Sequence, residues 1–231
     1  MIARTLVTVC TLALLSLWPV HGSAQNGPSQ EVFLPKGDKG PVVVVISGQS
    51  GPPHYRSYAN QVAGLGYYTV LIDGKDILTR TQDGAQNLRT VISNAQAAPN
   101  GMPGKVMVIG FSQGGGGVLA HAVAMSDLIT AAVAHYPAVS WSRNIPELAS
   151  RIKVPLLVLA AEQDRYNNCC LIDTIRELEA AAKAKQIPLE LVVYPNADHG
   201  FNLKGRTYRT DDTADAWRRA SEMLAKHHPV K

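Results

Sequence analysis

Short apolar runs alternate along the chain with longer segments in which apolar residues recur at helical spacing. The apolar runs predict strands at 42–47, 67–72, 105–109, 131–136, 155–161 and 189–194, with a short edge strand at 31–35. The helical segments are 55–65, 83–98, 113–125, 169–185 and 207–227. Because strands and helices alternate, we expect a mostly parallel sheet with helices on both faces. The stretch between the strands at 131–136 and 155–161 is too short to hold a separate lid domain.

The strongest chemical signal is the sequence Gly-Phe-Ser-Gln-Gly at 110–114, which directly follows an apolar run. A strand, then Gly-x-Ser-x-Gly, then a helix is the pattern of a nucleophile elbow, a sharp turn that exposes a serine hydroxyl to a base. Backbones come close together at such a turn, and Gly110 and Gly114 provide the small residues it needs. The alternative is a glycine-rich turn with an incidental serine, but the strand-to-helix context favours Ser112 as a nucleophile.

A serine nucleophile needs a base, and the base needs an acid to orient it. In chains with this elbow the order is serine, acid, histidine, each following a strand. Asp164 follows the run at 155–161, and His199 follows the run at 189–194. All three positions fall where the binding crevice of a parallel sheet opens. The sequence therefore predicts a triad of Ser112, His199 and Asp164.

Other acids and histidines compete for these roles. Glu162 is expected within its strand, and Asp198 adjoins His199 too closely in sequence to reach its ring; Asp173 is a third competitor. The other histidines are expected in the leader (His21), at a helix start (His54), inside a helix (His121), at a strand end that could line the site (His135) and in the C-terminal tail (His227 and His228).

A negatively charged oxygen that forms during attack needs two hydrogen-bond donors. One is expected to be the backbone N–H of Gln113, the residue after the nucleophile. The other should come from the loop that follows the strand at 42–47, and Gln49 is the candidate there. A simple glycine turn is the alternative interpretation of that loop.

Composition excludes some partners. The formal net charge is only +4, and charged residues make up 17% of the chain. No basic run is interleaved with aromatic residues, so the sequence does not indicate a nucleic-acid partner.

The N-terminus is typical of a secretory signal. A short positive segment at 1–4 precedes an apolar core at 5–18, which is shorter than the ~20 residues of a membrane span. Pro19 ends the core, and small residues lead to Ala24, after which we expect cleavage. We therefore predict a signal peptide at 1–24, a linker at 25–30, and one catalytic domain at 31–231. The protein is expected to be secreted or periplasmic and to have no membrane partner after cleavage.

Three cysteines are present, and Cys10 would leave with the leader. Cys169 and Cys170 are adjacent, which is not the spacing of a zinc or thioredoxin-type site. In an oxidising compartment they could form a vicinal disulfide or remain thiols. We expect them to begin a helix capped by Asn167 or Asn168, to fix the loop that carries Asp164, and to take no direct part in the reaction.

These motifs together resemble the α/β-hydrolase fold and, within it, the dienelactone hydrolase family. The resemblance covers most of the chain after the leader. It rests on the glycine-rich loop before a tyrosine-containing helix, and on 66–73, 110–115, Tyr136-Pro137, Asp164 and 198–201.

The chain departs from that family's best-known members at three places. They carry a cysteine where this chain has Ser112, and a glutamate in the loop that here reads Ser-Gly-Gln at 47–49. They also have an arginine shortly after the histidine, where this chain has Asn-Leu-Lys at 202–204 and Arg206 later. The resemblance therefore implies serine esterase chemistry and not the dienelactone substrate itself.

The sequence thus predicts an exported serine hydrolase that cleaves a small-molecule carboxylic ester or lactone through an acyl-enzyme. No cofactor or metal is implied. A peptidase or amidase with the same triad is the first alternative. A non-catalytic binding module on the same scaffold is the second, and an intact triad argues against it.

Overall fold

We describe residues 27–230 of a computed structural model of the chain. The predicted signal peptide at 1–24, with Cys10, and the start of the linker lie outside the described residues. The first strand includes Gln30, the last residue of the predicted linker.

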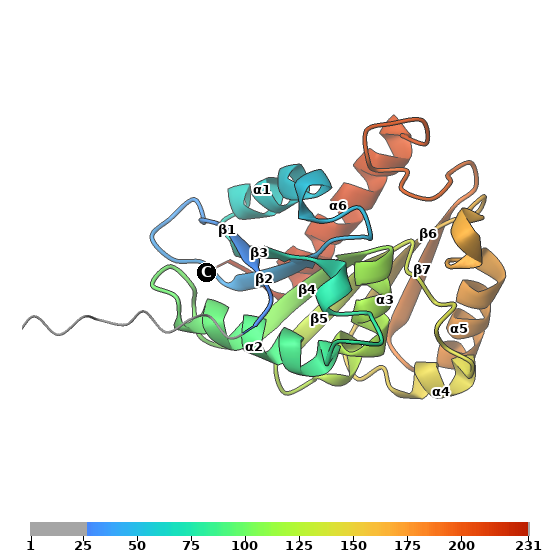
Figure 1. Ribbon diagram of the computed structural model, residues 1–231, viewed down its shortest axis with the longest axis horizontal. Helices are drawn as coiled ribbons and strands as arrows, with labels where there is room; N and C mark the ends of the chain where they lie inside the picture. The colour runs from blue at the N-terminus through green and yellow to red at the C-terminus, as the bar shows by residue number, and fades with distance from the viewer. Residues whose placement is uncertain (1–26, 231) are drawn as a thin grey trace, which may run out of the picture.

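A seven-stranded sheet forms the centre of the molecule (Figure 1). The strands are β1 (Gln30–Phe33), β2 (Val42–Ile46), β3 (Tyr68–Ile72), β4 (Val106–Phe111), β5 (Ile129–His135), β6 (Leu156–Ala161) and β7 (Leu189–Tyr194). Their order in space is β1-β3-β2-β4-β5-β6-β7. Only β1 at the edge is antiparallel to its neighbour, so the prediction of a mostly parallel sheet is confirmed.

Helices cover both faces of the sheet, as Figure 1 shows. Apolar side chains of α1 (Arg56–Gly64) and α6 (Thr210–His227) pack on one face. The other face is covered by α2 (Gly84–Ala97), α3 (Gln113–Ala120), α4 (Ile145–Ser150) and α5 (Ile172–Ala184). Alternate residues of each strand enter the two cores: Val43 and Val45 of β2 face α1 and α6, whereas Val44 faces the opposite layer. This burial on both faces explains why every residue of β2 is apolar.

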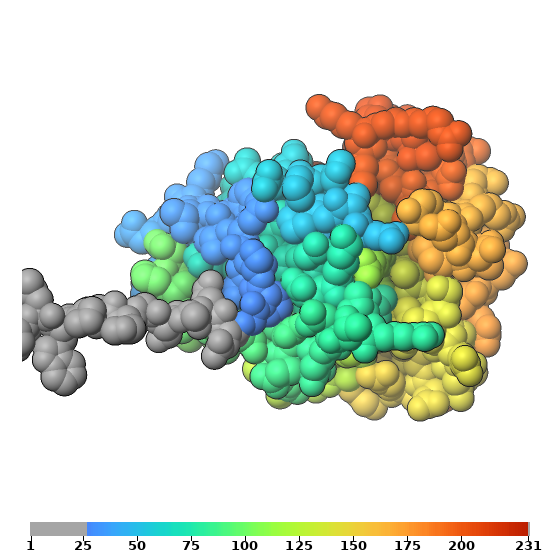
Figure 2. Space-filling model, in the orientation of Figure 1, coloured from blue at the N-terminus to red at the C-terminus, as the bar shows by residue number. Residues whose placement is uncertain are grey.

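The sheet order determines where chemistry can occur. Strands β4, β5, β6 and β7 are neighbours and run in the same direction. Their carboxyl ends therefore meet at one edge, and loops from distant parts of the sequence converge there. On the face seen in Figure 2, the first half of the chain (blue to green) lies largely on the left, and the second half (yellow to red) lies on the right.

Three of the predicted helices differ from the observed ones by three residues or more, and one of them, α6, begins at Thr210 and not at residue 207. The helix expected at 113–125 ends at Ala120, where His121 leaves helical geometry and a short 3₁₀ turn, η3 (Ala122–Ala124), follows. The helix expected from residue 169 begins only at Ile172, without a side-chain cap. Asn167 and Asn168 have positive φ values of 47° and 53°, a conformation that asparagine tolerates but that stops a helix. They do not cap α5 as predicted.

Helix α4 was not predicted from the apolar pattern because it has only six residues. Its start carries a recognisable signal. The Asn144 side chain accepts the backbone N–H of Glu147 at 3.0 Å, and Pro146 lies in the first turn.

None of the helices within 27–230 combines the length and the apolar character that crossing a membrane requires.

Candidate active site

Ser112 occupies the sharp turn between β4 and α3, with φ 50° and ψ −113°. Positive φ is uncommon for a residue with a side chain, and such strained backbone often occurs at active sites. Two glycines permit the turn. A Cβ atom at Gly110 would collide with the carbonyl oxygen of Gly114, and one at Gly114 would collide with the carbonyl oxygen of Ile46. The strand, turn and helix of the predicted nucleophile elbow are therefore present, with its serine at the start of α3.

The three predicted triad residues meet at the carboxyl edge of the sheet. The Ser112 Oγ lies 2.9 Å from His199 Nε2. The His199 Nδ1 lies 2.7 Å from Asp164 Oδ2, and the Asp164 side chain is fully buried. With Nδ1 protonated, the imidazole donates to the carboxylate and Nε2 accepts from the hydroxyl, which is the tautomer a general base needs.

Two of the three residues, Asp164 and His199, are held by their own loops. The second oxygen of Asp164, Oδ1, accepts the backbone N–H of Tyr166 at 3.1 Å, which fixes the carboxylate plane. The backbone N–H of His199 donates to the Asp198 side chain at 2.7 Å. These contacts leave the Nδ1–H of His199 as the partner of the remaining carboxylate oxygen.

Two tyrosine rings enclose the His199 imidazole. Tyr166 stacks on it with centroids 4.5 Å apart and planes 9° apart, and Tyr136 packs edge-on at 4.9 Å. The Tyr136 hydroxyl donates to Asn202 Oδ1 at 2.5 Å. Burial raises the pKa of Tyr136 well above its ordinary value, so its hydroxyl stays a neutral donor. Sequence reasoning gave neither tyrosine a role in the site, although both are close in sequence to strand ends that lead to it.

The competing acids lie elsewhere. Glu162 follows β6 and pairs with Arg176 at 2.6 Å. Asp173 is exposed in the first turn of α5. Asp198 accepts the backbone N–H of His199 and not its ring. Asp164 is therefore the carboxylate that contacts the histidine ring, as predicted.

His135, whose place at a strand end could have let it line the site, is instead part of the core. Its ring is 1% exposed and stacks on Phe111 at 4.4 Å, and neither ring nitrogen has a hydrogen-bond partner within the described chain. Burial lowers the pKa of His135 to about 3, so the ring is neutral. Its carbonyl oxygen accepts the backbone N–H of Ser112 at 3.0 Å. His135 thus supports the elbow through its backbone and does not act as the base.

The buried His135 should make the fold sensitive to acid. The unfolded chain protonates this imidazole below pH 6.5, whereas the folded chain resists protonation down to about pH 3. Stability present above pH 6.5 is therefore lost as the pH falls, at about 1.4 kcal/mol per pH unit. His135→Phe, which keeps a ring against Phe111, is expected to flatten this decline when the free energy of unfolding is measured by urea titration. His54→Gln, at an exposed histidine, is the control; an unchanged slope in His135→Phe would refute the assignment.

The loop after β2 and the start of α3 both lie beside the nucleophile. A Cβ atom at Gly48 would be 3.2 Å from the Ser112 Cβ, so this loop contacts the serine. Gln49 is the next residue of the same loop. Within 27–230, neither the N–H of Gln49 nor that of Gln113 has a hydrogen-bond acceptor. The Gln113 side chain is tied elsewhere, to the Leu78 carbonyl oxygen at 2.8 Å. These free donors agree with the predicted oxyanion hole, and the role of Gln49 stays a prediction.

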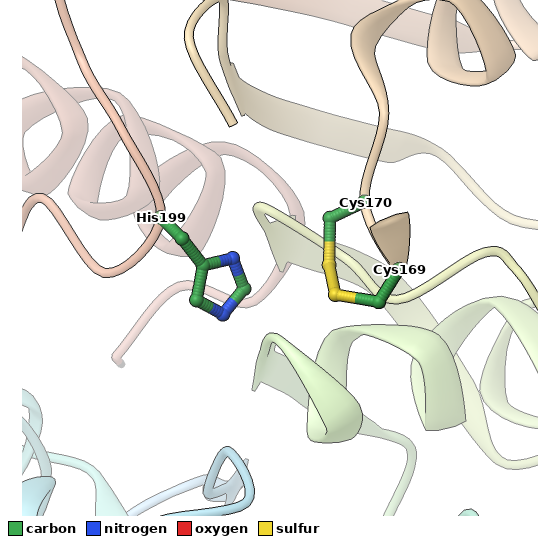
Figure 3. A group of neighbouring side chains, drawn as sticks. All are labelled: Cys169, Cys170 and His199. Carbon is green, nitrogen blue, oxygen red and sulfur yellow. A yellow bond between two sulfur atoms is a disulfide. The ribbon is translucent and has the colours of Figure 1, made fainter. Parts of the chain in front are cut away.

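Cys169 and Cys170 form a disulfide with each other. Their Sγ atoms and one ring nitrogen of His199 all lie within 4.8 Å of one another. Figure 3 shows the nitrogen-bearing edge of the imidazole turned toward the sulfurs. The pair therefore lies beside His199, closer to the predicted triad than the role of a loop constraint suggested. Its position five residues beyond Asp164 was the available signal.

Cys169, Cys170 and His199 are residue types that can bind a metal ion, and the described part of the chain brings them together. Cysteine binds metals as a thiolate, and both sulfurs here are bonded to each other. Both nitrogens of His199 are hydrogen-bonded within the triad. The donor set in this form does not fit a metal ion.

A cavity of about 370 Å³ lies between α1, α6 and the loop after His199. Aromatic rings of Tyr55, Tyr58 and Trp217 line much of it, and the triad side chains do not. Asn202 both lines the cavity and accepts the Tyr136 hydroxyl, so Tyr136 is adjacent to this cavity and to His199.

The parallel sheet, the elbow after β4 and the converging triad define the α/β-hydrolase fold. Residues 30–228 match the Dienelactone hydrolase family, and the chain belongs to that family. A Salmonella typhi protein named "Putative carboxymethylenebutenolidase" is 33% identical over 130 residues, which are 53% of this chain and 47% of that protein. The match thus spans about half the length of this relative.

Solved structures share the fold over a larger part of the chain. A thermophilic esterase of Thermogutta terrifontis, with propionate bound, has a TM-score of 0.65 and 20% identity. The superposition covers 89% of this chain and 96% of that one. Est1E of Butyrivibrio proteoclasticus has a TM-score of 0.63 and 17% identity, and covers 85% of this chain and 94% of its own.

Proposed function

We propose that this protein is a serine hydrolase that cleaves a carboxylic ester or lactone through an acyl-enzyme intermediate. The observation that carries the proposal is the continuous chain of contacts from Asp164 through His199 to Ser112, with distances of 2.7 and 2.9 Å. Membership of the Dienelactone hydrolase family supports a hydrolase, and relatives named for carboxymethylenebutenolidase activity support a small ester or lactone as substrate.

The first half of the reaction forms the acyl-enzyme. Ser112 Oγ attacks the ester carbonyl carbon as its proton passes to His199 Nε2. The carbonyl oxygen becomes negative and accepts hydrogen bonds from the backbone N–H groups of Gln113 and Gln49. The amino end of α3 adds its positive dipole at the same place. The buried carboxylate of Asp164 stabilises the imidazolium, which then gives its proton to the departing alcohol.

The second half releases the acid. A water molecule takes the place of the alcohol, and His199 removes its proton as the water oxygen attacks the acyl carbon. The bond to Ser112 Oγ then breaks, and the serine recovers its proton from the imidazolium. His199 therefore acts in both halves, whereas the alcohol is present only in the first.

The proposal is tested with purified protein lacking residues 1–24. A fluorophosphonate probe should label Ser112, and p-nitrophenyl esters of short acyl chains should be hydrolysed with burst kinetics. Peptide anilides supplied in parallel should be poor substrates. Labelling with faster anilide than ester cleavage would favour a peptidase or amidase. Absence of both labelling and hydrolysis would favour a binding module.

We also propose that the chain is exported after cleavage following Ala24. The positive and apolar segments of the first 18 residues support this, as does a disulfide, a bond that oxidising compartments favour. Mass spectrometry of protein from the periplasm or medium should give an N-terminus at Gln25. Recovery of only the uncleaved chain, inside the cell, would contradict the proposal.

A further inference from the structure

We propose that the Cys169–Cys170 disulfide is a contact surface for the alcohol portion of the ester, and that it makes the enzyme select apolar alcohols. This inference rests on the proposed ester hydrolysis and specifies which half of the substrate the disulfide contacts. In this role the sulfurs touch the substrate, and no bond to them forms or breaks.

Position is the first argument. To receive a proton from His199 Nε2, the alcohol oxygen must lie within hydrogen-bond distance, about 3 Å. Both sulfurs are within 4.8 Å of a ring nitrogen of the same imidazole, on the edge that carries its nitrogens (Figure 3). In the proposed complex, the first carbon atoms of the alcohol lie between this edge of the imidazole and the disulfide.

The backbone of the disulfide is also held in place by the loop after β5. The Cys169 carbonyl oxygen accepts two backbone N–H groups from the loop after β5, those of Val139 at 2.7 Å and Ser140 at 3.1 Å. Cys170 is buried, with 3% exposure, while Cys169 is partly exposed. The sulfurs therefore present a fixed surface and not a mobile one.

The chemistry of the surface indicates its ligand. A disulfide has no hydrogen to donate, and its sulfurs are polarisable and only weak acceptors. Tyr166, which precedes the pair in sequence, keeps 46% of its surface exposed and adds an aromatic ring on the face of the His199 imidazole. Such a surface gains from contact with aliphatic or aromatic groups and gives nothing to a hydroxyl-rich or charged alcohol.

The order of the reaction makes the idea testable. Because the alcohol departs when the acyl-enzyme forms, the disulfide should influence acylation and leave deacylation unchanged. A pair that only positions His199 would behave differently, because the histidine acts in both halves and both would slow together.

The experiment compares wild type with the double variant Cys169→Ser/Cys170→Ser. Acetate esters of methanol, butanol and benzyl alcohol probe the alcohol side, and benzyl esters of longer acids probe the acyl side. We expect the benzyl-to-methyl ratio of kcat/KM to fall by about tenfold. The preference among acyl chains and the single-turnover rate of deacylation should not change. Arg165→Ala, at an exposed position in the same loop, is the matched control and should keep the wild-type ratio.

A measurement on unaltered protein covers the case in which the double variant does not fold. Benzyl alcohol should inhibit wild type at clearly lower concentration than glycerol, and it should compete with ester. Equal inhibition by both alcohols, an unchanged benzyl-to-methyl ratio, or a parallel loss of acylation and deacylation would each overturn the inference. The outcome also separates this inference from the proposed function. If wild type neither hydrolyses esters nor reacts with fluorophosphonate, both fail together. If wild type is active but the double variant keeps its benzyl-to-methyl ratio of kcat/KM, only this inference fails.

Discussion

Ser112→Ala is expected to lower kcat/KM for ester hydrolysis by about 10⁵–10⁶-fold while the protein stays folded. Without the hydroxyl no acyl-enzyme can form, and water must attack the bound ester unaided by a nucleophile. Alanine inherits the same φ of 50°, so the substitution adds no new backbone strain at the turn. The measurement is steady-state hydrolysis of a p-nitrophenyl ester, together with thermal unfolding to confirm an intact fold.

Ser221→Ala is the matched control for that result. Its hydroxyl donates only to the Trp217 carbonyl oxygen of its own helix, α6, far from the elbow in sequence. We expect wild-type kinetics there. Near-normal hydrolysis by folded Ser112→Ala, with fluorophosphonate labelling retained, would mean that another residue is the nucleophile.

The fold was predictable from sequence because its strands are buried on both faces. Runs such as Val42 to Ile46 contain no polar residue and are bounded by turn residues, so both their type and their approximate limits can be recognised. Each helix with an apolar stripe was likewise found. Helix α4 was missed because six residues are too few to establish a period.

The meeting of the three predicted triad residues was predictable for a different reason. A parallel sheet brings the ends of its strands to one edge, so Ser112, Asp164 and His199 could be assigned by their positions after strands, without knowing any distance. The order of β4, β5, β6 and β7 then placed these loops side by side. The sequence predicted Asp164 by its position, but the side-chain direction that brings its Oδ2 to 2.7 Å from the His199 ring is seen only in the structure.

What the sequence could not predict depends on contacts between distant loops. His135 ends a strand near the site, yet its ring turns into the core against Phe111 and Tyr58. Cys169 and Cys170 looked like the start of a helix, yet the left-handed Asn167 and Asn168 turn the chain so that the pair faces His199. In both cases the direction of a side chain was decided by tertiary packing and not by local pattern.

Asp164→Asn is expected to lower turnover by about 10⁴-fold with little change in structure. The carboxylate accepts from His199 Nδ1 at 2.7 Å and from the Tyr166 N–H at 3.1 Å. An amide of the same shape can keep the second contact, but if its NH₂ group faces the ring it donates to Nδ1. That arrangement moves the imidazole proton to Nε2, where it blocks removal of the serine proton, and no negative charge remains to stabilise the imidazolium.

The identity of the acid is tested by the neighbouring carboxylate. Glu162→Gln removes a charge two residues away in sequence that pairs with Arg176 at 2.6 Å, and we expect it to retain near wild-type turnover. The measurement is kcat for a fast acyl substrate in both variants, with fluorophosphonate labelling rates as a second readout of serine reactivity. A mild Asp164→Asn and a severe Glu162→Gln would assign the acid to Glu162. We expect the opposite pattern because of burial. Water does not screen the interaction between the fully buried Asp164 carboxylate and the imidazole, whereas Glu162 is partly exposed.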